Sequence, residues 1–327
     1  MKSIVRNFVA GMSAGIVLVA ASSVLAQGTY PSKPVRMVVP FPPGGQTDIV
    51  ARFLGEGLTK AWGQSVVIEN RAGAGGTIGT DLVAKSAPDG YTLLVCSSGP
   101  TAIAPSVYTR LPYDFNRDFS AIMGLTSTPS VIGIHAGLAP KTLAEFVEYV
   151  KARQGQVAFS SPGAGISSHL AMEDFAFALG LKMVHVPYKG SAPALNAVMA
   201  GEVAAIFDPV STLAPLAKGG KVGALAISGA RRSPLLPDVP TIAEAGYKGI
   251  ESSSWNCLLG PAGMPAPVVA KIHRDAGALL KSAELKNTLQ TMGSEVLDIG
   301  PAELTAYVKT ETDKWGVVAR RVNARVE

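Results

Sequence analysis

The chain has 327 residues, of which 47% are hydrophobic and 16% charged, and a formal net charge of +5. This apolar content excludes wholesale disorder, and the length suits one large domain or two of ordinary size. Basic residues are scattered, with doublets only at 231–232 and 320–321, which argues against the concentrated basic face of a nucleic-acid-binding protein.

The chain begins with a segment typical of exported proteins. Lys2 and Arg6 precede the apolar run FVAGMSAGIVLVAASSVLA, and Val24 and Ala26 occupy the −3 and −1 positions of a small-residue cleavage site. We expect residues 1–26 to be a signal peptide that is removed after Ala26, with a retained membrane anchor as the alternative. The mature chain would then be exported.

Downstream, short apolar runs alternate with helical patterns. In the first helical pattern, Ile49, Phe53 and Leu58 follow the 3.6-residue period, with charged residues between them. Such alternation predicts an α/β fold, and at this length two α/β lobes rather than one sheet. The expected strands are 35–41, 65–69, 92–97, 130–135, 157–161, 182–188, 204–207, 223–228, 254–259 and 295–299. The expected helices are 47–61, 78–85, 143–153, 167–179, 192–200, 242–246, 266–281, 283–292 and 301–323.

Four turns between an expected strand and an expected helix share one composition. They are FPPGGQTD (41–48), CSSGPTAIAPS (96–106), SSPGAGISSH (160–169) and YKGSAPA (188–194), and all are rich in Gly, Ser, Thr and Pro. Ligands of open α/β sheets bind beyond the carboxyl ends of the strands, where helix N-termini present unpaired N–H groups. Together the turns predict a site that grips an oxyanion with neutral donors. For any one turn, ordinary turn and cap chemistry is the alternative.

Single side chains near these turns each have two interpretations. Asp48 suits either a helix-start partner, together with Thr47, or a residue that shapes the site. Asp208 ends an apolar strand, where it could accept a hydrogen bond from a ligand amine or hydroxyl or merely cap a turn. Phe41 and Tyr188 lie at strand ends, as walls of a ligand site or as the edge of the core.

The sequence lacks the usual motifs for catalysis, nucleotides and metals. The segment GAGGTIG has Ile78 where the dinucleotide pattern needs glycine, and the four histidines lack metal-ligand spacing. We interpret His169 and His185 as hydrogen-bonded structural residues, with a ligand or catalytic role as the alternative. Cys96 and Cys257 are interpreted as buried free thiols, with a disulfide as the alternative. We expect no catalytic residue, metal or cofactor.

Six longer motifs run in order from about Tyr30 to near the C-terminus: PFPPGGQTDIVAR, WGQSVVIENRAGAGGTIG, AKSAPDGYTLL, HVPYKGSAPALNAVMAGEV, LPDVPTIAEAG and GPAGMPAPVV. In this order they resemble the substrate-binding receptors of tripartite tricarboxylate transporters, also called Bug receptors. The resemblance implies a type II periplasmic-binding-protein fold, in which two α/β lobes joined by two crossing strands close around a ligand. It places lobe one at 27–128 plus 251–327 and lobe two at 129–250.

The resemblance also implies a site. In that family a carboxylate is held between the turn after the first strand and a lobe-two turn, partly through ordered waters, and Asp208 matches a position that helps define specificity. Gln46 departs from the family, whose members often carry a small residue there, and its amide could reach the cleft and alter selectivity. From the turns and the resemblance together, the expected ligand-binding residues are Phe41, Gly44, Gly45, Thr47, Asp48, Ser97, Ser98, Thr101, Ser161, Gly163, Ala164, Ser168, Tyr188 and Asp208.

The implied function is that of a periplasmic receptor, not an enzyme, which delivers its ligand to two integral membrane transporter subunits. Apart from Lys189, the cleft loops carry no Lys or Arg, so the three charges of a tricarboxylate would be poorly served. We therefore expect a monomer that binds an aliphatic or aromatic mono- or dicarboxylate. The alternatives are a ligand sensor for a signalling partner and, less favoured, a secreted enzyme that uses His169 or Asp208 as a general base.

Overall fold

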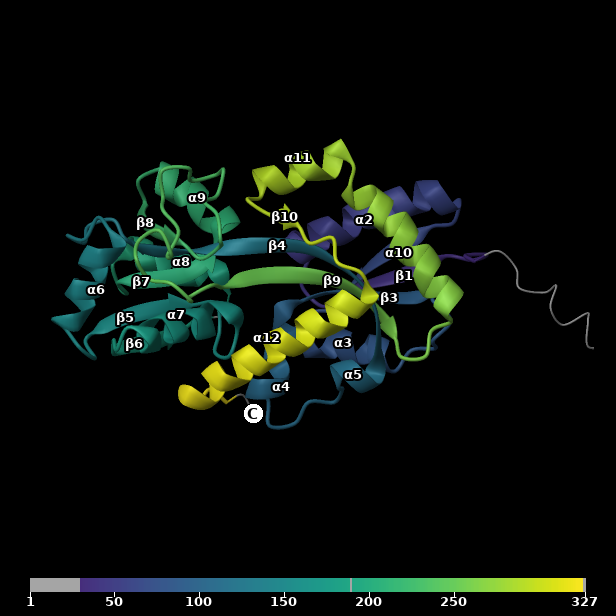
Figure 1. Cartoon of the computed structure of the whole chain (residues 1–327), viewed down its shortest axis with the longest axis horizontal. Helices are drawn as coiled ribbons and strands as arrows, with labels where there is room; N and C mark the ends of the chain where they lie inside the picture. Colours follow the sequence, from purple (N-terminus) through teal and green to yellow (C-terminus); the bar gives the residue numbers. More distant parts are fainter. Residues whose placement is uncertain (1–29, 189, 326–327) are drawn as a thin grey trace, which may run out of the picture.

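The structure is a computed structural model that describes residues 30–188 and 190–325, so the expected signal peptide and its cleavage site lie outside the described residues. Two α/β lobes lie side by side along the long axis and are joined by two long strands (Figure 1). The predicted fold class, two α/β lobes joined by two crossing strands, is confirmed. The residue boundaries expected for the lobes stay a prediction.

The two connecting strands are β4 (Phe119–His135) and β9 (Ser253–Pro261). The first part of β4 pairs antiparallel with β9, and the last part lies between β7 (Ala205–Pro209) and β8 (Val222–Ile227), also antiparallel to both. One 17-residue strand therefore belongs to the sheets of both lobes.

Lobe one contains a mixed sheet. Its order is β2-β1-β3-β9-β4, in which β1 is parallel to β2 and β3, and β10 pairs with β4. Buried apolar residues fill the inner strands β1, β3 and β9, as strands covered on both faces require. The strands are β1 (Val35–Val39), β2 (Val66–Asn70), β3 (Thr92–Ser97) and β10 (Glu295–Val296). The helical elements are α2 (Gln46–Trp62), η1 (Ala74–Gly76), α3 (Thr77–Ala84), η2 (Gly99–Ile103), α4 (Ala104–Val107), α5 (Phe115–Asp118), α10 (Ala266–Leu280), α11 (Ala283–Thr291) and α12 (Pro301–Arg321).

Lobe two has the sheet order β4-β7-β5-β6, in which β5 is parallel to both β6 and β7. Its further strands are β5 (Val157–Ser161) and β6 (Met183–Pro187), and its helices are α6 (Leu143–Lys151), α7 (Ser167–Ala178), α8 (Ser191–Ala200) and α9 (Val210–Lys218). None of the helices in the described part of the chain has the length and hydropathy needed to cross a bilayer.

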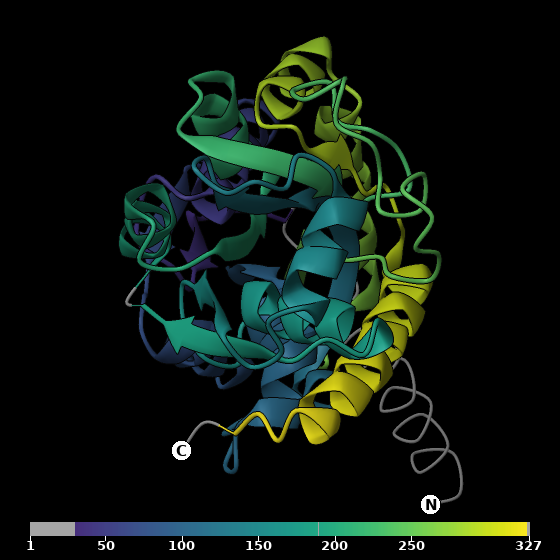
Figure 2. The ribbon, with the colours of Figure 1, turned by 90° about the vertical axis from the view of Figure 1, so that its left-hand side faces the viewer.

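Helix α12 forms a third link between the lobes. It packs against β4 and α4 and reaches α7 of lobe two, where Arg321 pairs with Asp174 at 3.0 Å. The Arg321 guanidinium also lies 3.8 Å from the ring centre of Phe177 in the same helix. Figure 2, viewed from lobe two, shows α12 in yellow along one side of the molecule. The two lobes are thus joined by two strands and tied by a helix.

The local sequence patterns failed at four places. The expected strand at 130–135 is only the end of β4, whose longer first part contains Gly124 and Pro129. Helix α9 was not expected, because Pro215 lies inside it and lacks the N–H that a helix interior uses. The helix expected at 242–246 is a series of turns, and the strand expected at 295–299 covers only two residues.

Cys96 and Cys257 face each other as register partners in β3 and β9. Both are fully buried free thiols, as expected, and burial raises the pKa of each. They therefore serve as small apolar residues of the core rather than as reactive thiols.

Gly79 in α3 packs directly against backbone. A Cβ at this position would lie 2.7 Å from the carbonyl oxygen of Arg71 and 2.9 Å from the Cα of Pro40. Because backbone cannot move aside as a side chain can, we expect Gly79→Ala to lower the free energy of unfolding by about 1–3 kcal/mol. Gly277→Ala in α10 is the matched control: its Cβ would make an ordinary 3.7 Å contact with Met123 Cε, and alanine is the better helix former. Equal urea midpoints for the two variants would contradict this account.

Candidate ligand-binding site

The strand directions make the two lobes face each other with their carboxyl ends. In lobe one, β3 is antiparallel to β9, which is antiparallel to β4, so β1 and β3 run in the direction of β4, toward lobe two. In lobe two, β7 is antiparallel to β4 and parallel to β5, so β5 and β7 run toward lobe one. The four predicted turns follow the carboxyl ends of β1, β3, β5 and β6. The topology therefore places them on the facing edges, where ligands of α/β sheets bind.

Asp48 organises the turn after β1. It is almost fully buried and accepts hydrogen bonds from the Gly44 N–H (2.9 Å), Asn70 Nδ2 (2.8 Å) and Arg52 Nε (2.9 Å). Burial alone would raise the pKa of Asp48, but these hydrogen bonds and the Arg52 charge outweigh it and lower the pKa. Asp48 is therefore an ionised carboxylate that shapes the turn, while the backbone of Gly44 and Gly45 stays exposed.

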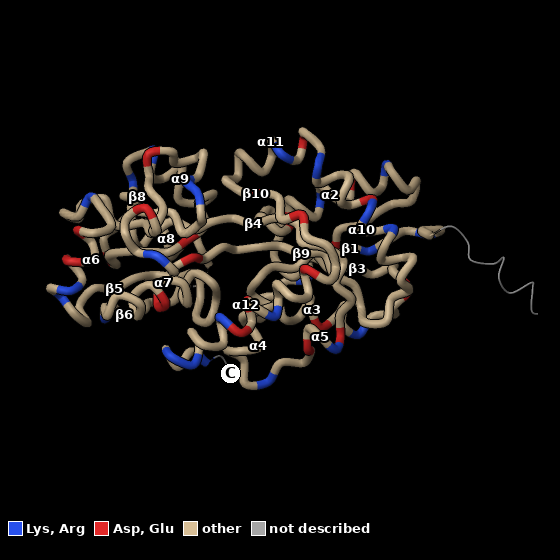
Figure 3. The backbone as a smooth tube through the Cα atoms, viewed as in Figure 1, with Lys and Arg blue, Asp and Glu red and all other residues tan. Residues whose placement is uncertain are grey.

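Four helices that start at the facing edges have uncapped N-termini within the described chain. No side chain caps α2 after Gly45, α7 after Ile166, α8 after Gly190 or α9 after Pro209. Elsewhere α5, α6 and α11 are capped by Asp114, Thr142 and Ser282, whereas α10, after Pro265, is uncapped. The first-turn N–H groups of α2, α7, α8 and α9 have no partner within their helices and carry a partial positive charge. Backbone N–H groups at helix N-termini are well suited to hold an oxyanion. Figure 3 shows the charged residues scattered over both lobes.

Ser98, on the turn after β3, has a side-chain hydroxyl that is unsatisfied in the described part of the chain. Its hydroxyl is buried and has no hydrogen-bond partner among the described residues, a state that costs about 1–3 kcal/mol. Ser97 beside it is half-buried, and its carbonyl oxygen accepts a hydrogen bond from the Thr101 hydroxyl. Thr101 instead lines a separate hollow of about 190 Å³ with residues such as Asp114 and Val308. Of the predicted residues on this turn, Ser98 is thus the one whose side chain is buried without a partner among the described residues.

Two histidines hold the turn after β5. Ser161 Oγ donates to the Gly163 carbonyl oxygen (2.7 Å) and accepts from His185 Nε2 (2.6 Å), and His169 Nδ1 accepts from the Gly165 N–H (3.0 Å). The two imidazole rings stack at 3.7 Å. Burial, and after it the charge of His169, lower the pKa of His185 to about 4. Both histidines are hydrogen-bonded, and their structural role stays a prediction; no group of three potential metal-ligating side chains occurs in residues 30–188 and 190–325.

Asp208 lies fully buried at the end of β7. It accepts hydrogen bonds from Thr212 Oγ1 (2.6 Å) and Ser168 Oγ (3.3 Å). Burial raises the pKa of Asp208 to about 6, although both hydrogen bonds act against the rise. Tyr188 is half-buried, and its N–H donates to the Ser161 carbonyl oxygen at 2.9 Å. The structure thus gathers four predicted residues around the ends of β5, β6 and β7.

Phe41 occupies the corresponding place at the end of β1. Its ring is half-buried, and a Cβ added to Gly76 would lie 3.1 Å from Phe41 Cζ and equally close to Pro100 Cγ. The turns after β1 and β3 therefore meet at this ring. In the turn after β5, Gly163 is half-exposed and Ala164 exposed, so the backbone at these two positions is accessible.

No sequence pattern predicted that polar residues of the connecting strands would contact the turn after β1. Thr47 Oγ1 donates to Asn256 Oδ1 (2.7 Å), and Asn256 Nδ2 donates to Thr126 Oγ1 (2.9 Å). Gln46 Nε2 donates to Thr128 Oγ1 and to Ser294 Oγ, so its amide nitrogen is occupied rather than reaching the cleft. These partners lie 82 to 248 residues away along the chain, and no local pattern marks them.

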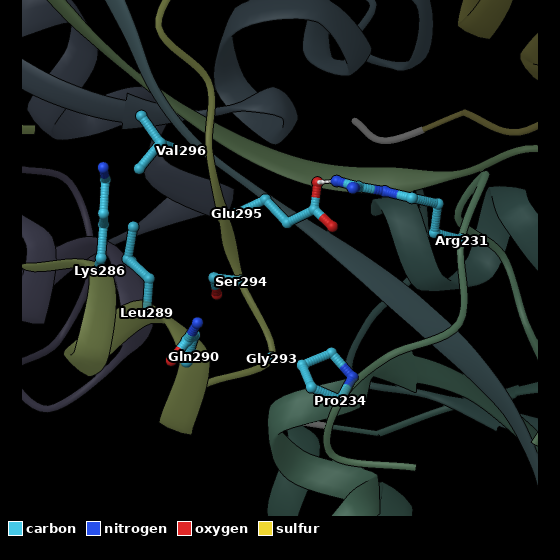
Figure 4. A pocket seen from close by; sticks show the side chains of 9 residues that line it. All are labelled: Arg231, Pro234, Lys286, Leu289, Gln290, Gly293, Ser294, Glu295 and Val296. Atoms are coloured by element: carbon cyan, nitrogen blue, oxygen red, sulfur yellow. Dashed lines mark hydrogen bonds and ion pairs between the residues drawn. The ribbon is translucent and has the colours of Figure 1, made fainter. Parts of the chain in front are cut away.

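The hollow in Figure 4, of about 380 Å³, lies where lobe two meets α11 and β10. Arg231 and Pro234 come from lobe two, and Leu289, Ser294 and other residues come from lobe one. It is lined by none of the predicted ligand-binding residues, and an ion pair of 2.7 Å between Arg231 and Glu295 spans it. This hollow therefore lies at the contact between the two lobes, away from the predicted ligand-binding residues.

Two α/β lobes joined by crossing strands, with helix N-termini on the facing edges, define the class of periplasmic solute-binding proteins. Residues 50–324 match the family described as "Tripartite tricarboxylate transporter family receptor". The chain belongs to this family, and its fold and family are those of solute-binding receptors, as predicted.

Similar proteins of known name or structure agree with this assignment. Protein BugT of Bordetella pertussis is 36% identical over 300 residues, which cover 91% of this chain and 92% of BugT. The structure of R. palustris Rpa4515 with adipate is 33% identical, has a TM-score of 0.81 and covers 89% of this chain and 97% of that one. MatC from Rhodopseudomonas palustris with bound malate is 34% identical, has a TM-score of 0.77 and covers 88% and 99%.

Asp208 makes the stability of the fold depend on pH. The ordinary pKa of an aspartate is 3.8, and that of folded Asp208 is about 6. Between these values the folded protein keeps a proton that the unfolded chain has lost, so this residue lowers the free energy of unfolding as the pH rises from about 4 to 6. We expect Asp208→Asn to be more stable than the parent above pH 6, by up to about 3 kcal/mol, and equally stable near pH 4.

Urea unfolding between about pH 4 and 8 measures this difference. His185, whose pKa is lowered, acts in the opposite direction over part of this range, but it acts equally in both proteins and cancels in the comparison. Asp238→Asn, on an exposed position of the same lobe, is the control and should stay within about 0.5 kcal/mol of the parent. A difference between Asp208→Asn and the parent that does not vary with pH would refute the assignment.

Proposed function

We propose that this protein is a periplasmic receptor that binds a small mono- or dicarboxylate between its lobes and delivers it to the two integral membrane subunits of a tripartite tricarboxylate transporter. One observation carries the proposal: uncapped helix N-termini from both lobes, α2 on one side and α7 and α9 on the other, start at strand ends that face each other. Unpaired N–H groups there can bind carboxylate oxygens at once, without the cost of displacing a cap.

The related structures support a dicarboxylate in particular. Adipate and malate each carry two carboxylates, and a two-lobed site can hold one against each lobe. Among the described residues, Asp48 is the one proposed contact residue with an ion-pair partner, Arg52, and none of the proposed contact residues is itself basic. The proposed contacts are Phe41, Gly44, Gly45, Thr47, Asp48, Ser97, Ser98 and Thr101 in lobe one, and Ser161, Gly163, Ala164, Ser168, Tyr188 and Asp208 in lobe two.

Location and assembly are part of the same proposal. The family's description and the periplasmic binding protein BugD, 37% identical over 91% of this chain, support an exported receptor. Export would use the segment before residue 27, and the receptor would act as a monomer that closes around its ligand.

A thermal-shift screen of residues 27–327, refolded to remove any retained ligand, tests the function. The panel holds malate, adipate, an aromatic acid and citrate, each beside its amide or ester. A ligand at a hundred times its Kd adds about 2.7 kcal/mol to stability, which for a protein of this size raises the melting temperature by about 4 °C. We expect a mono- or dicarboxylate to raise it and its amide not to. Citrate as the only stabilising acid, or amides as effective as acids, would contradict the proposal.

Ser98 gives a sharper prediction at the residue level. Because its buried hydroxyl has no partner among the described residues, Ser98→Ala should leave the ligand-free melting temperature unchanged or slightly higher. A lost hydrogen bond to a carboxylate should weaken binding at least tenfold in isothermal titration calorimetry.

Ser160→Ala is the matched control for this variant. Its buried hydroxyl donates to the Ala194 carbonyl oxygen at 3.0 Å, so its loss should lower the melting temperature and leave affinity nearly unchanged. If Ser98→Ala behaves like Ser160→Ala, then Ser98 does not contact the ligand.

A further inference from the structure

Gln46 joins three segments that are far apart in the sequence. It is the first residue of α2, in the turn proposed to bind a carboxylate, and its Nε2 donates to Thr128 Oγ1 of β4 and to Ser294 Oγ at 3.1 Å. The two hydroxyl oxygens lie 2.8 Å apart and bond to each other. Thr128 and Ser294 are both buried. Since a primary amide has two N–H groups, Gln46 has none left for a ligand.

The residue before Ser294 touches lobe two. A Cβ on Gly293 would lie 2.5 Å from Val210 Cγ1 and 2.9 Å from Leu235 Cδ1, so only glycine fits between the lobes at this point. Gly293 also has a φ of +61°, which other residues rarely adopt. Val210 is the first residue of α9 and follows Asp208 by two positions. A continuous packed path thus runs from the lobe-one turn through Gln46 and Ser294 to the lobe-two part of the site.

The residue after Ser294 adds a second contact between the lobes. Glu295 pairs with Arg231 of lobe two, and Figure 4 shows its carboxylate directed toward the Arg231 side chain. Ser294, just before β10, bonds to Thr128 of β4, while Glu295 in β10 reaches Arg231 of lobe two. The short segment 293–295 is therefore a joint between the lobes, and Gln46 is the side chain that fastens the ligand turn to it.

We propose that Gln46 is a positioning residue that fixes the lobe-one ligand turn relative to lobe two, and so sets affinity without touching the ligand. The inference deepens the proposed function and rests on it for the ligand class alone. The physical reason is preorganisation: two halves of a site that are held in register lose less conformational freedom when a ligand bridges them. A residue that acts in this way changes how tightly every acid binds but not which acid binds best.

Loss of the Gln46 amide should weaken binding of each accepted carboxylate by about tenfold, because a turn that is no longer held must lose its conformational freedom when the ligand binds. The order of preference among acids should stay the same. Gln46→Asn should behave like Gln46→Ala, because its shorter side chain keeps the amide but not the reach. Ser294→Ala should cause a smaller loss, and adding it to Gln46→Ala should cause little further loss, since both act through one contact.

Gln290→Ala is the matched control. Gln290 is an exposed glutamine of α11 that lines the same hollow, and it lies outside the hydrogen bonds described here. Its loss should leave affinity and the order of preference unchanged. An altered order of preference in Gln46→Ala would mean that the residue touches the ligand, and would overturn the inference.

A readout without ligand separates this inference from the proposed function. Spin labels on Lys60→Cys in lobe one and Glu148→Cys in lobe two, both highly exposed in the parent, report the distance between the lobes, and the two native cysteines are fully buried. We expect Gln46→Ala to broaden the ligand-free distance distribution and Gln290→Ala not to. Broadening in a protein that binds no carboxylate would support positioning and refute the proposed function. An unchanged distribution would overturn the inference whether or not an acid binds.

Discussion

The antiparallel pairing of β4 is the constraint on which both lobes depend. Its first part pairs with β9 in lobe one, and its last part lies between β7 and β8 in lobe two. Because each antiparallel neighbour reverses direction, the course of this one strand makes β1 and β3 end opposite β5 and β7. The facing edges that bear the proposed site therefore follow from strand topology, and any motion between the lobes must bend strands and helix α12 rather than a loose linker.

The connecting strands and the ligand turn also satisfy each other's polar groups. Thr126, Thr128 and Asn256 are almost completely buried, and burial of a hydroxyl or amide without a partner costs several kcal/mol. Gln46 and Thr47 supply partners for this group from the turn after β1. An apolar strand at this place would pack as well but would leave the turn free to shift, so the buried polar cluster links the position of the ligand turn to the strands about which the lobes move.

Much of the fold could be predicted from the sequence because βα units have local sequence signals, namely apolar runs, periodicity and turn residues. Strands β3 and β5 have the predicted bounds, and helices α2, α7 and α8 begin and end within one residue of their own predicted bounds. Local patterns could not predict pairing between distant parts of the chain. The first half of β4, which contains Gly124 and Pro129, was not predicted, and neither were the hydrogen-bond partners of Gln46. The turns of the site could be predicted from their composition. The sequence could not show that the hydroxyls of Thr47, Thr101 and Ser161 are already hydrogen-bonded within the protein.

The two lobes differ in how they treat negative charge, and this difference bears on what the site would accept. Asp48 in lobe one is compensated by Arg52, so the turn after β1 can receive a carboxylate with little repulsion. Asp208 in lobe two is held by two hydroxyls and no cation, and its raised pKa reflects that burial. A ligand carboxylate placed against an ionised Asp208 would be repelled, whereas a ligand hydroxyl or amine would donate to it. In the proposed site, Asp208 would therefore favour acids that carry a hydroxyl or an amine next to it.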